Sequence, residues 1–264
     1  MEISLKGKKA IVTGSSRGVG FSIAEKLALS GATVLLNGRS EQGVQEAIMQ
    51  LKQSNPLAEV TGCAADISTK EGFQAIVNTW NKADILIHNA GVYEPKPFLE
   101  INDDEWEYYV ELHILGAVRL SRHYIKGMTQ NNWGRVLFNG SVTGGFFSGE
   151  MVHYGTTKAA LLGLSRGIAE SVSGSGVTVN TFLPGPTKTE KVQRFIENEA
   201  SRLNQSEGEF EKKLFHDSLP TSIINRFVTP EEVANLVVFL ASNQASAITG
   251  ATLKVDGGIV RSIL

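Results

Sequence analysis

Short runs of β-branched and apolar residues alternate with longer amphipathic stretches along the whole 264-residue chain. Strands are predicted at residues 9–13, 33–36, 59–65, 84–88, 135–138, 177–182 and 251–255. Helices are predicted between them, over residues 18–30, 41–53, 69–81, 103–128, 154–173 and 230–241. Such alternation implies right-handed crossovers and a parallel sheet with helices on both faces. We therefore expect one doubly wound α/β domain over residues 1–264, built on a seven-stranded parallel sheet.

One segment departs from this alternation. Between residues 187 and 220 no strand is predicted, and apolar residues recur at the spacing of a helix face, which predicts two amphipathic helices. These apolar residues are Val192, Phe195, Ile196, Leu203, Phe210, Leu214 and Phe215. Because a strandless stretch of this length inside a compact domain is usually a functional lid or a mobile loop, we interpret residues 187–220 as a lid over the substrate.

Charge and cysteine content narrow the classes of function. The net charge is −2 and the pI is about 6.2, so the basic surface of a nucleic-acid or anionic-membrane binder is not expected. Cys63 is the single cysteine, which allows no internal disulfide and no Cys/His metal pattern. The sequence has no apolar run of membrane-spanning length and no signal-peptide core. We expect a cytoplasmic protein without metal, nucleic-acid or membrane partners.

A glycine-rich turn follows the first predicted strand. Its residues are Gly14, Ser16, Arg17, Gly18, Val19 and Gly20. Gly14 would let the chain turn sharply, while the next two glycines would let the backbone approach a pyrophosphate and let the helix pack on the sheet. Phosphates would then lie at the helix N-terminus, where free N–H groups and the dipole favour anions. The position of this turn, between a first strand and a first helix, predicts a Rossmann-type dinucleotide site.

The end of the second strand distinguishes the two nicotinamide cofactors. An NAD site usually presents an acidic residue there to the ribose 2′-hydroxyl. This chain reads Asn-Gly-Arg-Ser over residues 37–40, without an acid. Arg39, together with Arg17, could bracket a 2′-phosphate through bidentate bonds. The sequence thus favours NADP(H) over NAD(H); the alternative is that both arginines are only solvated.

A tyrosine, a lysine and a serine form a potential acid/base group. Tyr154 and Lys158 are one helical turn apart and share a helix face. An ammonium beside a phenol favours the phenolate, so Lys158 is expected to lower the pKa of Tyr154 from its usual value of about 10. Ser141, thirteen residues before Tyr154, could hydrogen-bond a substrate oxygen. The trio can therefore transfer a proton to or from a substrate.

These motifs together resemble the short-chain dehydrogenase/reductase family over essentially the whole chain. In the family's order they are the turn of residues 13–20, Asp66-Ile67, Asn89-Ala90-Gly91, Ser141, Tyr154 with Lys158, Pro184-Gly185 with Thr187, and the Asp-Gly-Gly of residues 256–258. The chain is similar to members called 3-oxoacyl carrier-protein reductases. It implies a single-domain Rossmann fold, an NAD(P)-dependent interconversion of a carbonyl and an alcohol, and a homodimer or homotetramer.

The resemblance also implies a role for each matching residue. Asp66 and Ile67 would contact the adenine; Asn89, Ala90 and Gly91 would line the ribose and nicotinamide side; Pro184, Gly185 and Thr187 would hold the carboxamide end. Tyr154 would be the general acid in reduction, Lys158 would bind the nicotinamide ribose, and Ser141 would orient the substrate carbonyl.

Two residues depart from the family pattern. His88 stands where an asparagine is common, and because it ends a buried strand we interpret it as structural. His113 replaces the helix asparagine that usually completes the catalytic set and helps hold a water in the proton relay. Histidine can hydrogen-bond but titrates near neutral pH. Two readings stay open: an altered relay partner, or a helix residue packed against the sheet.

The sequence constrains the substrate less. In carrier-protein reductases, two arginines help dock the acidic carrier; Asn132 and Ser175 stand at these positions, which disfavours that substrate. A pocket wall is predicted from Tyr93, Pro95, Phe146, Phe147, Met151 and Val152. We therefore expect a ketone or alcohol with a sizeable apolar body, unless these side chains are ordinary packing. A nucleotide-binding regulator without catalysis and a 3-oxoacyl thioester reductase are the alternatives.

Overall fold

The computed structural model describes residues 2–144 and 149–262 and contains the predicted parallel sheet. Its seven strands are β1 (Lys9–Val12), β2 (Thr33–Gly38), β3 (Val60–Ala64), β4 (Ile85–His88), β5 (Gly134–Asn139), β6 (Val177–Pro184) and β7 (Thr252–Val255). They are arranged in the order β3-β2-β1-β4-β5-β6-β7, and every pair is parallel. The doubly wound Rossmann prediction is confirmed.

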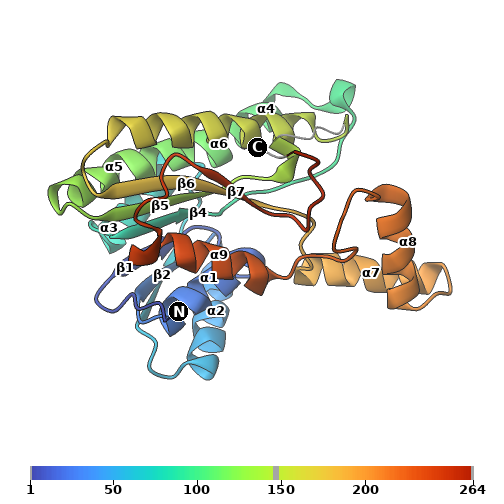
Figure 1. The fold of residues 1–264 in the computed structure, drawn as a ribbon, viewed down its shortest axis with the longest axis horizontal. Helices are drawn as coiled ribbons and strands as arrows, with labels where there is room; N and C mark the ends of the chain where they lie inside the picture. Colours follow the sequence, from blue (N-terminus) through green and yellow to red (C-terminus); the bar gives the residue numbers. More distant parts are fainter. Residues whose placement is uncertain (1, 145–148, 263–264) are drawn as a thin grey trace.

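Helices cover both faces of this sheet (Figure 1). One layer holds α1 (Gly18–Leu29), α2 (Glu41–Ser54) and α9 (Pro230–Leu240); the other holds α3 (Lys70–Thr79), α4 (Asp103–Val110), α5 (Gly116–Gln130) and α6 (Val152–Ser171). The strands alternate between the two layers. In β1, Ala10 and Val12 pack with α1 and α9, while Ile11 packs with α3 and α5. Both faces are apolar, as expected for parallel strands covered on both sides.

The helix predicted over residues 103–128 is interrupted. Asn102 and Glu105 form a capping box at its start, but residues Glu111–Leu115 form a π-helical turn before α5 begins. Directly after this turn the helix passes close to the turn that follows β3: a Cβ on Gly116 would be 2.7 Å from the carbonyl oxygen of Ile67. The prediction of one regular helix was wrong in this turn, which also carries His113. π-helical turns of this kind occur frequently at functional sites.

The segment predicted as a lid contains two helices, α7 (Glu190–Arg202) and α8 (Glu207–Ser218). They pack on each other around a separate apolar cluster of Ile196, Ala200, Phe210, Phe215 and Phe227. In Figure 1 the pair lies beside the carboxyl end of the sheet, away from both helical layers. No helix among the described residues is long and apolar enough to cross a membrane.

Candidate active site

The carboxyl ends of β1, β4 and β5 are joined by one asparagine. The Asn89 side chain donates to the carbonyl oxygens of Thr13 (3.0 Å) and Gly14 (2.9 Å), and it accepts a bond from Asn139 (2.8 Å). The Thr13 hydroxyl accepts the backbone N–H groups of Asn89 and Ala90, both at 3.0 Å. Asn89 therefore fixes the floor of the site with its whole carboxamide.

The glycine-rich turn has room for backbone only. Gly14 has a φ of 61°, and a Cβ on it would lie 2.6 Å from the Cα of Ala90. A Cβ on Gly20 would lie 2.3 Å from the carbonyl oxygen of Gly14. The first turn of α1 contains no acidic residue, and its N-cap, Arg17, makes no side-chain capping bond. Its free N–H groups thus suit a phosphate.

Two arginines lie beside this turn without an acidic partner. Arg17 and Arg39 are exposed, and neither forms an ion pair within residues 2–144 and 149–262; Arg39 donates a long bond, 3.4 Å, to the Tyr108 hydroxyl. Asn37, at the end of β2, is held inside by backbone: it accepts from Gly14 and donates to two carbonyls at the end of β3. The positive charges of Arg17 and Arg39, beside the N-terminus of α1, therefore fit a ligand that carries more than one phosphate.

A cavity of about 340 Å³ follows this edge of the sheet. The predicted cofactor residues that line it are Gly14, Ser16, Arg17, Val19, Gly20, Arg39, Asp66, Ile67, Asn89, Ala90 and Gly91. Gly18 lines the adjoining cleft. Backbone glycines, free helix N–H groups and two guanidinium groups that form no ion pair in the described part of the chain lie together here, so the cavity fits a dinucleotide.

The residues predicted to hold the carboxamide end of the cofactor do not line this cavity. Gly185 donates its N–H to Val255, 2.9 Å away, and the Thr187 hydroxyl bonds the carbonyl of Gly185, so Pro184, Gly185 and Thr187 shape the turn after β6. Thr189, which the sequence reading missed, lines both the cavity and the cleft. Its signal was a threonine followed by an acid at the start of an amphipathic stretch, because Thr189 caps α7.

The acid/base trio is brought together beside this cavity by β5 and α6. Lys158 is 3% exposed, donates to the carbonyl oxygen of Asn139 at 2.7 Å, and has its Nζ 5.6 Å from the centre of the Tyr154 ring. Ser141 follows β5, where its hydroxyl pairs with that of Thr143. The Ser141 side chain also hydrogen-bonds Tyr154. The three side chains can therefore meet one carbonyl oxygen.

The pKa of Tyr154 differs from the sequence prediction. Burial raises it, the Ser141 hydrogen bond lowers it, and Tyr93 raises it further. Burial also lowers the pKa of Lys158 to about 7. A lysine that is only partly charged at neutral pH stabilises a neighbouring phenolate little. The prediction that Lys158 lowers the pKa of Tyr154 was therefore wrong for the protein without its cofactor.

His113 is buried and both ring nitrogens are occupied. Nε2 accepts the Val92 N–H at 3.2 Å, so the proton lies on Nδ1, which donates to the Thr157 hydroxyl at 2.8 Å. That hydroxyl donates to the carbonyl of Tyr154 at 2.9 Å. Burial first, and then the charges of Lys158 and His153, hold the pKa of His113 well below 6.5. The ring is therefore neutral at physiological pH.

His88 has the structural role predicted for it. Its Nε2 bonds the Ser121 hydroxyl at 2.8 Å, and its ring stacks on Phe138 with centroids 4.9 Å apart. Burial lowers its pKa to about 3.

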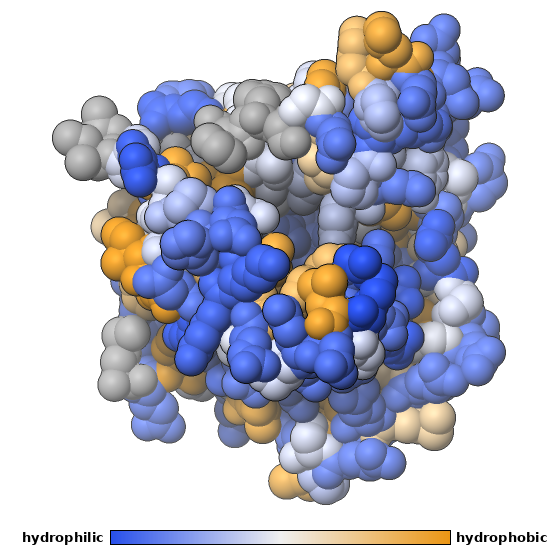
Figure 2. All heavy atoms as spheres, turned by 90° about the vertical axis from the view of Figure 1, so that its right-hand side faces the viewer, coloured by the Kyte–Doolittle hydropathy of each residue, from blue (hydrophilic) through white to orange (hydrophobic). Residues whose placement is uncertain are grey.

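A cleft of about 1160 Å³ opens between α7 and α4. More of its lining surface is apolar than polar, although most of its lining residues are charged or aromatic, including Arg17, Arg39, Lys191, Arg194, Glu94, Asp104, Glu105, Glu190, Tyr93, Tyr108, Tyr109 and Phe195. Figure 2 looks onto this side of the molecule, whose surface is mainly hydrophilic with separate hydrophobic patches. The Tyr93 ring lies 6.1 Å from that of Tyr154, and Lys191 Nζ lies 4.9 Å from the Tyr93 ring. Of the predicted apolar wall, Pro95, Met151 and Val152 are absent from this lining, and Phe146 and Phe147 lie outside the described residues.

Comparisons with known proteins agree with this geometry. The family described as "Enoyl-(Acyl carrier protein) reductase" matches residues 14–260. The chain is 42% identical to the uncharacterized oxidoreductase YvaG of Bacillus subtilis (strain 168), covering all of both chains. It is 35% identical to the 3-oxoacyl-[acyl-carrier-protein] reductase FabG of Aquifex aeolicus, over 98% of this chain and all of the relative. The crystal structure of L-sorbose reductase from Gluconobacter frateurii, complexed with NADPH and L-sorbose, matches with a TM-score of 0.92 and 32% identity over both whole chains.

Proposed function

Because the chain belongs to the short-chain dehydrogenase/reductase family and is an NAD(P)-dependent oxidoreductase, we propose that it uses NADP(H) to interconvert a ketone and a secondary alcohol. The observation that carries this proposal is the meeting of Ser141, Tyr154 and Lys158 next to a cavity flanked by two unpaired arginines. When bound, the dinucleotide supplies or accepts the hydride.

The 2′-phosphate is assigned to Arg17 and Arg39. Their guanidinium groups have no acidic partner in the described part of the chain, and no acid stands at the end of β2 to hold a ribose 2′-hydroxyl. The pyrophosphate is assigned to the first turn of α1, and the adenine to Asp66 and Ile67. The NADPH complex of the sorbose reductase, which shares this fold, supports the same cofactor here.

Proton transfer is assigned to Tyr154. In reduction, the Ser141 hydroxyl donates a hydrogen bond to the substrate oxygen, and the Tyr154 hydroxyl gives that oxygen its proton as negative charge develops. The raised pKa of Tyr154 keeps the acid protonated at neutral pH. Lys158, held at the Asn139 carbonyl, orients the ribose side of the site.

His113 is proposed to hold the site in place and not to relay protons by titrating. Its lowered pKa leaves it neutral, and its two hydrogen bonds tie the loop after β4 to α6. This role would be contradicted if the pH–rate profile of the unmodified enzyme had an inflection near pH 6.5 that is absent from the profile of His113→Asn.

The substrate we propose is a polyhydroxy ketone or the corresponding alcohol. The carboxylates and cations of the lining offer hydrogen bonds to several hydroxyl groups, and its tyrosine rings offer flat faces to the carbon skeleton of such a substrate. L-sorbose, the ligand in the similar reductase structure, is a compound of this kind. An apolar ketone, as expected from the sequence, is the second candidate, supported by Tyr93 and Phe195.

The test is the loss of NADPH absorbance with matched sets of polyhydroxy and aliphatic ketones, repeated with NADH. We expect turnover of a polyhydroxy ketone with NADPH, and a loss of about 10³-fold in kcat for Tyr154→Phe with little change in cofactor affinity. Turnover of aliphatic ketones alone would overturn the substrate assignment. Tight NADPH binding without turnover of any ketone would favour a nucleotide-binding regulator.

A 3-oxoacyl thioester reductase is the alternative within the family, because the Aquifex relative carries that name. The two docking positions argue against it: the side chain of Ser175 bonds the carbonyl of Val172, and Asn132 adopts a φ of 53° in a turn. Neither residue carries a positive charge. Turnover of a carrier-bound 3-oxoacyl thioester in preference to free ketones would decide for this alternative.

We also propose that the protein forms a homodimer or homotetramer through α6. This helix belongs to one of the two helical layers in Figure 1, and its Leu162 is only partly buried while Ala160 is exposed. Apolar side chains beyond those that face the sheet suit a contact between helices of two subunits. A monomer in analytical ultracentrifugation at micromolar concentration would contradict this.

A further inference from the structure

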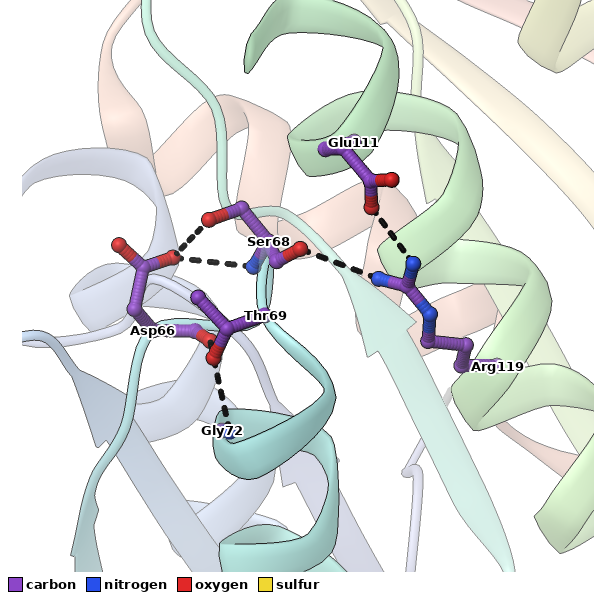
Figure 3. Close-up of polar contacts among 6 residues, drawn as sticks. All are labelled: Asp66, Ser68, Thr69, Gly72, Glu111 and Arg119. Atoms are coloured by element: carbon purple, nitrogen blue, oxygen red, sulfur yellow. Dashed lines mark hydrogen bonds and ion pairs between the residues drawn. The ribbon is translucent and has the colours of Figure 1, made fainter. Parts of the chain in front are cut away.

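Arg119 connects two parts of the molecule that meet the cofactor cavity from different sides. It lies in the first turn of α5, and its side chain is 14% exposed. Nη1 donates to the carbonyl oxygen of Ser68 at 3.1 Å, and Nη2 donates to Oε2 of Glu111 at 2.6 Å (Figure 3). Ser68 belongs to the turn after β3, and Glu111 begins the π-helical turn.

The turn after β3 controls the direction of Asp66. One oxygen of its carboxylate, Oδ1, accepts the N–H and the hydroxyl of Ser68 at 2.9 and 2.7 Å (Figure 3). The Thr69 hydroxyl donates to the Asp66 carbonyl at 3.0 Å and accepts the Gly72 N–H at 2.9 Å, which starts α3. Within the described chain, Oδ2 of Asp66 accepts no hydrogen bond, so it is free for a ligand in the cavity that Asp66 lines.

Two helices hold this turn by close backbone contact. A Cβ on Gly72 would lie 1.8 Å from the carbonyl oxygen of Asp66, and a Cβ on Gly116 would lie 2.7 Å from that of Ile67. Arg119 adds the side-chain bond from α5 to the next carbonyl, that of Ser68. A fork-shaped guanidinium that is mostly buried and bonded at both ends fixes geometry better than a flexible ammonium would.

We propose that Arg119 is a positioning residue for the adenine end of the cofactor. By holding the Ser68 carbonyl, it keeps Asp66 and the backbone of Ile67 directed into the cavity. Through Glu111 it anchors this turn to the π-helical turn that carries His113. The inference rests on the proposed function only in that an adenine dinucleotide occupies the cavity.

Calorimetric binding of 2′,5′-ADP and of ADP tests the inference without any need for turnover. For Arg119→Met we expect both ligands to bind about tenfold more weakly, since the adenine contact is common to both. The control is Arg122→Met on the same helix, where an exposed arginine is replaced and binding should be unchanged. If the unmodified protein binds ADP as tightly as 2′,5′-ADP, the NADP preference fails while the Arg119 inference stands.

A second measurement separates positioning from general support of the fold. Reduced nicotinamide mononucleotide lacks the adenine, so kcat/KM for it should be the same in Arg119→Met and the unmodified enzyme, while kcat/KM for NADPH falls about tenfold. If Arg119→Met does not fold, Arg119→Lys replaces it, and we expect a several-fold loss because one ammonium cannot reproduce both bonds. Unchanged adenine-nucleotide binding, or an equal loss with both reduced nucleotides, would overturn the proposal.

Discussion

Burial of Lys158 links the chemistry of the site to the pH dependence of folding. The folded protein holds the pKa of this lysine at about 7, whereas an unfolded lysine has a pKa of about 10.4. Between these values the unfolded chain binds more protons than the folded one. The contribution of Lys158 to the free energy of unfolding therefore increases as pH rises from about 7 to about 10.

This gives a prediction at the scale of one residue. From pH 7 to pH 9, the free energy of unfolding of the unmodified protein should gain about 2 kcal/mol relative to that of Lys158→Met, in which this titration is removed. Urea denaturation of both proteins at both pH values measures the difference, and the other titrating groups, present in both, cancel. If the free energy of unfolding changes with pH by the same amount in both proteins, then folding does not lower the pKa of Lys158.

At the scale of elements, the π-helical turn shows where sequence patterns stop being informative. The apolar spacing over residues 103–128 predicts a helix, and a helical path is present on both sides of Glu111–Leu115. One π-helical turn contains one residue more than an α-helical turn, and this shifts the spacing of apolar residues too little to be recognised in the sequence. The turn lies next to a contact between elements distant in sequence, where a Cβ on Gly116 would be 2.7 Å from the Ile67 carbonyl oxygen.

Two glycines of α5 offer a matched comparison. Gly116→Ala should lower the free energy of unfolding by about 1–3 kcal/mol, because the added methyl group meets backbone. Gly127→Ala, on the same helix with nothing within 4 Å of its added Cβ, should raise it by roughly 0.5–1 kcal/mol through helix propensity. Chemical denaturation measures both changes, and equal effects of the same sign would refute the role of the close contact.

On the scale of the whole molecule, the helix pair α7–α8 and the sheet have separate cores. The apolar cluster of the helix pair shares no buried residue with the two clusters that flank the sheet. Ile196→Asp places a charge in the fully buried centre of the helix pair. We expect the main thermal transition to move by only a few degrees, while kcat/KM falls at least about tenfold because local unfolding removes one wall of the cleft.

The control for this prediction is Leu203→Asp, at the end of α7, where the side chain is 39% exposed and the cost of a charge is small. If Ile196→Asp unfolds the sheet together with α7 and α8, as seen by a single transition shifted by more than about 10 °C, then the two cores are not independent.

The parallel sheet and the glycine turn could be predicted because each depends on local pattern: alternation specifies a parallel sheet, and only glycine fits at Gly14 and Gly20. Contacts between residues that meet at the carboxyl edge of the sheet could not be predicted from the sequence. No sequence pattern indicates that the Asn89 carboxamide bonds two backbone carbonyls and the Asn139 side chain. The pKa of Tyr154 was predicted in the wrong direction because burial is a property of the folded molecule.

The separate core of α7 and α8 has a consequence for how such a protein can diversify. Cofactor recognition is built into the sheet and its first turns, whereas one wall of the cleft belongs to a segment that packs mainly on itself. Mutations in that segment need not be compensated in the sheet. We expect relatives to exchange substrate preference through this segment as a replaceable module, while the nucleotide half of the molecule stays unaltered.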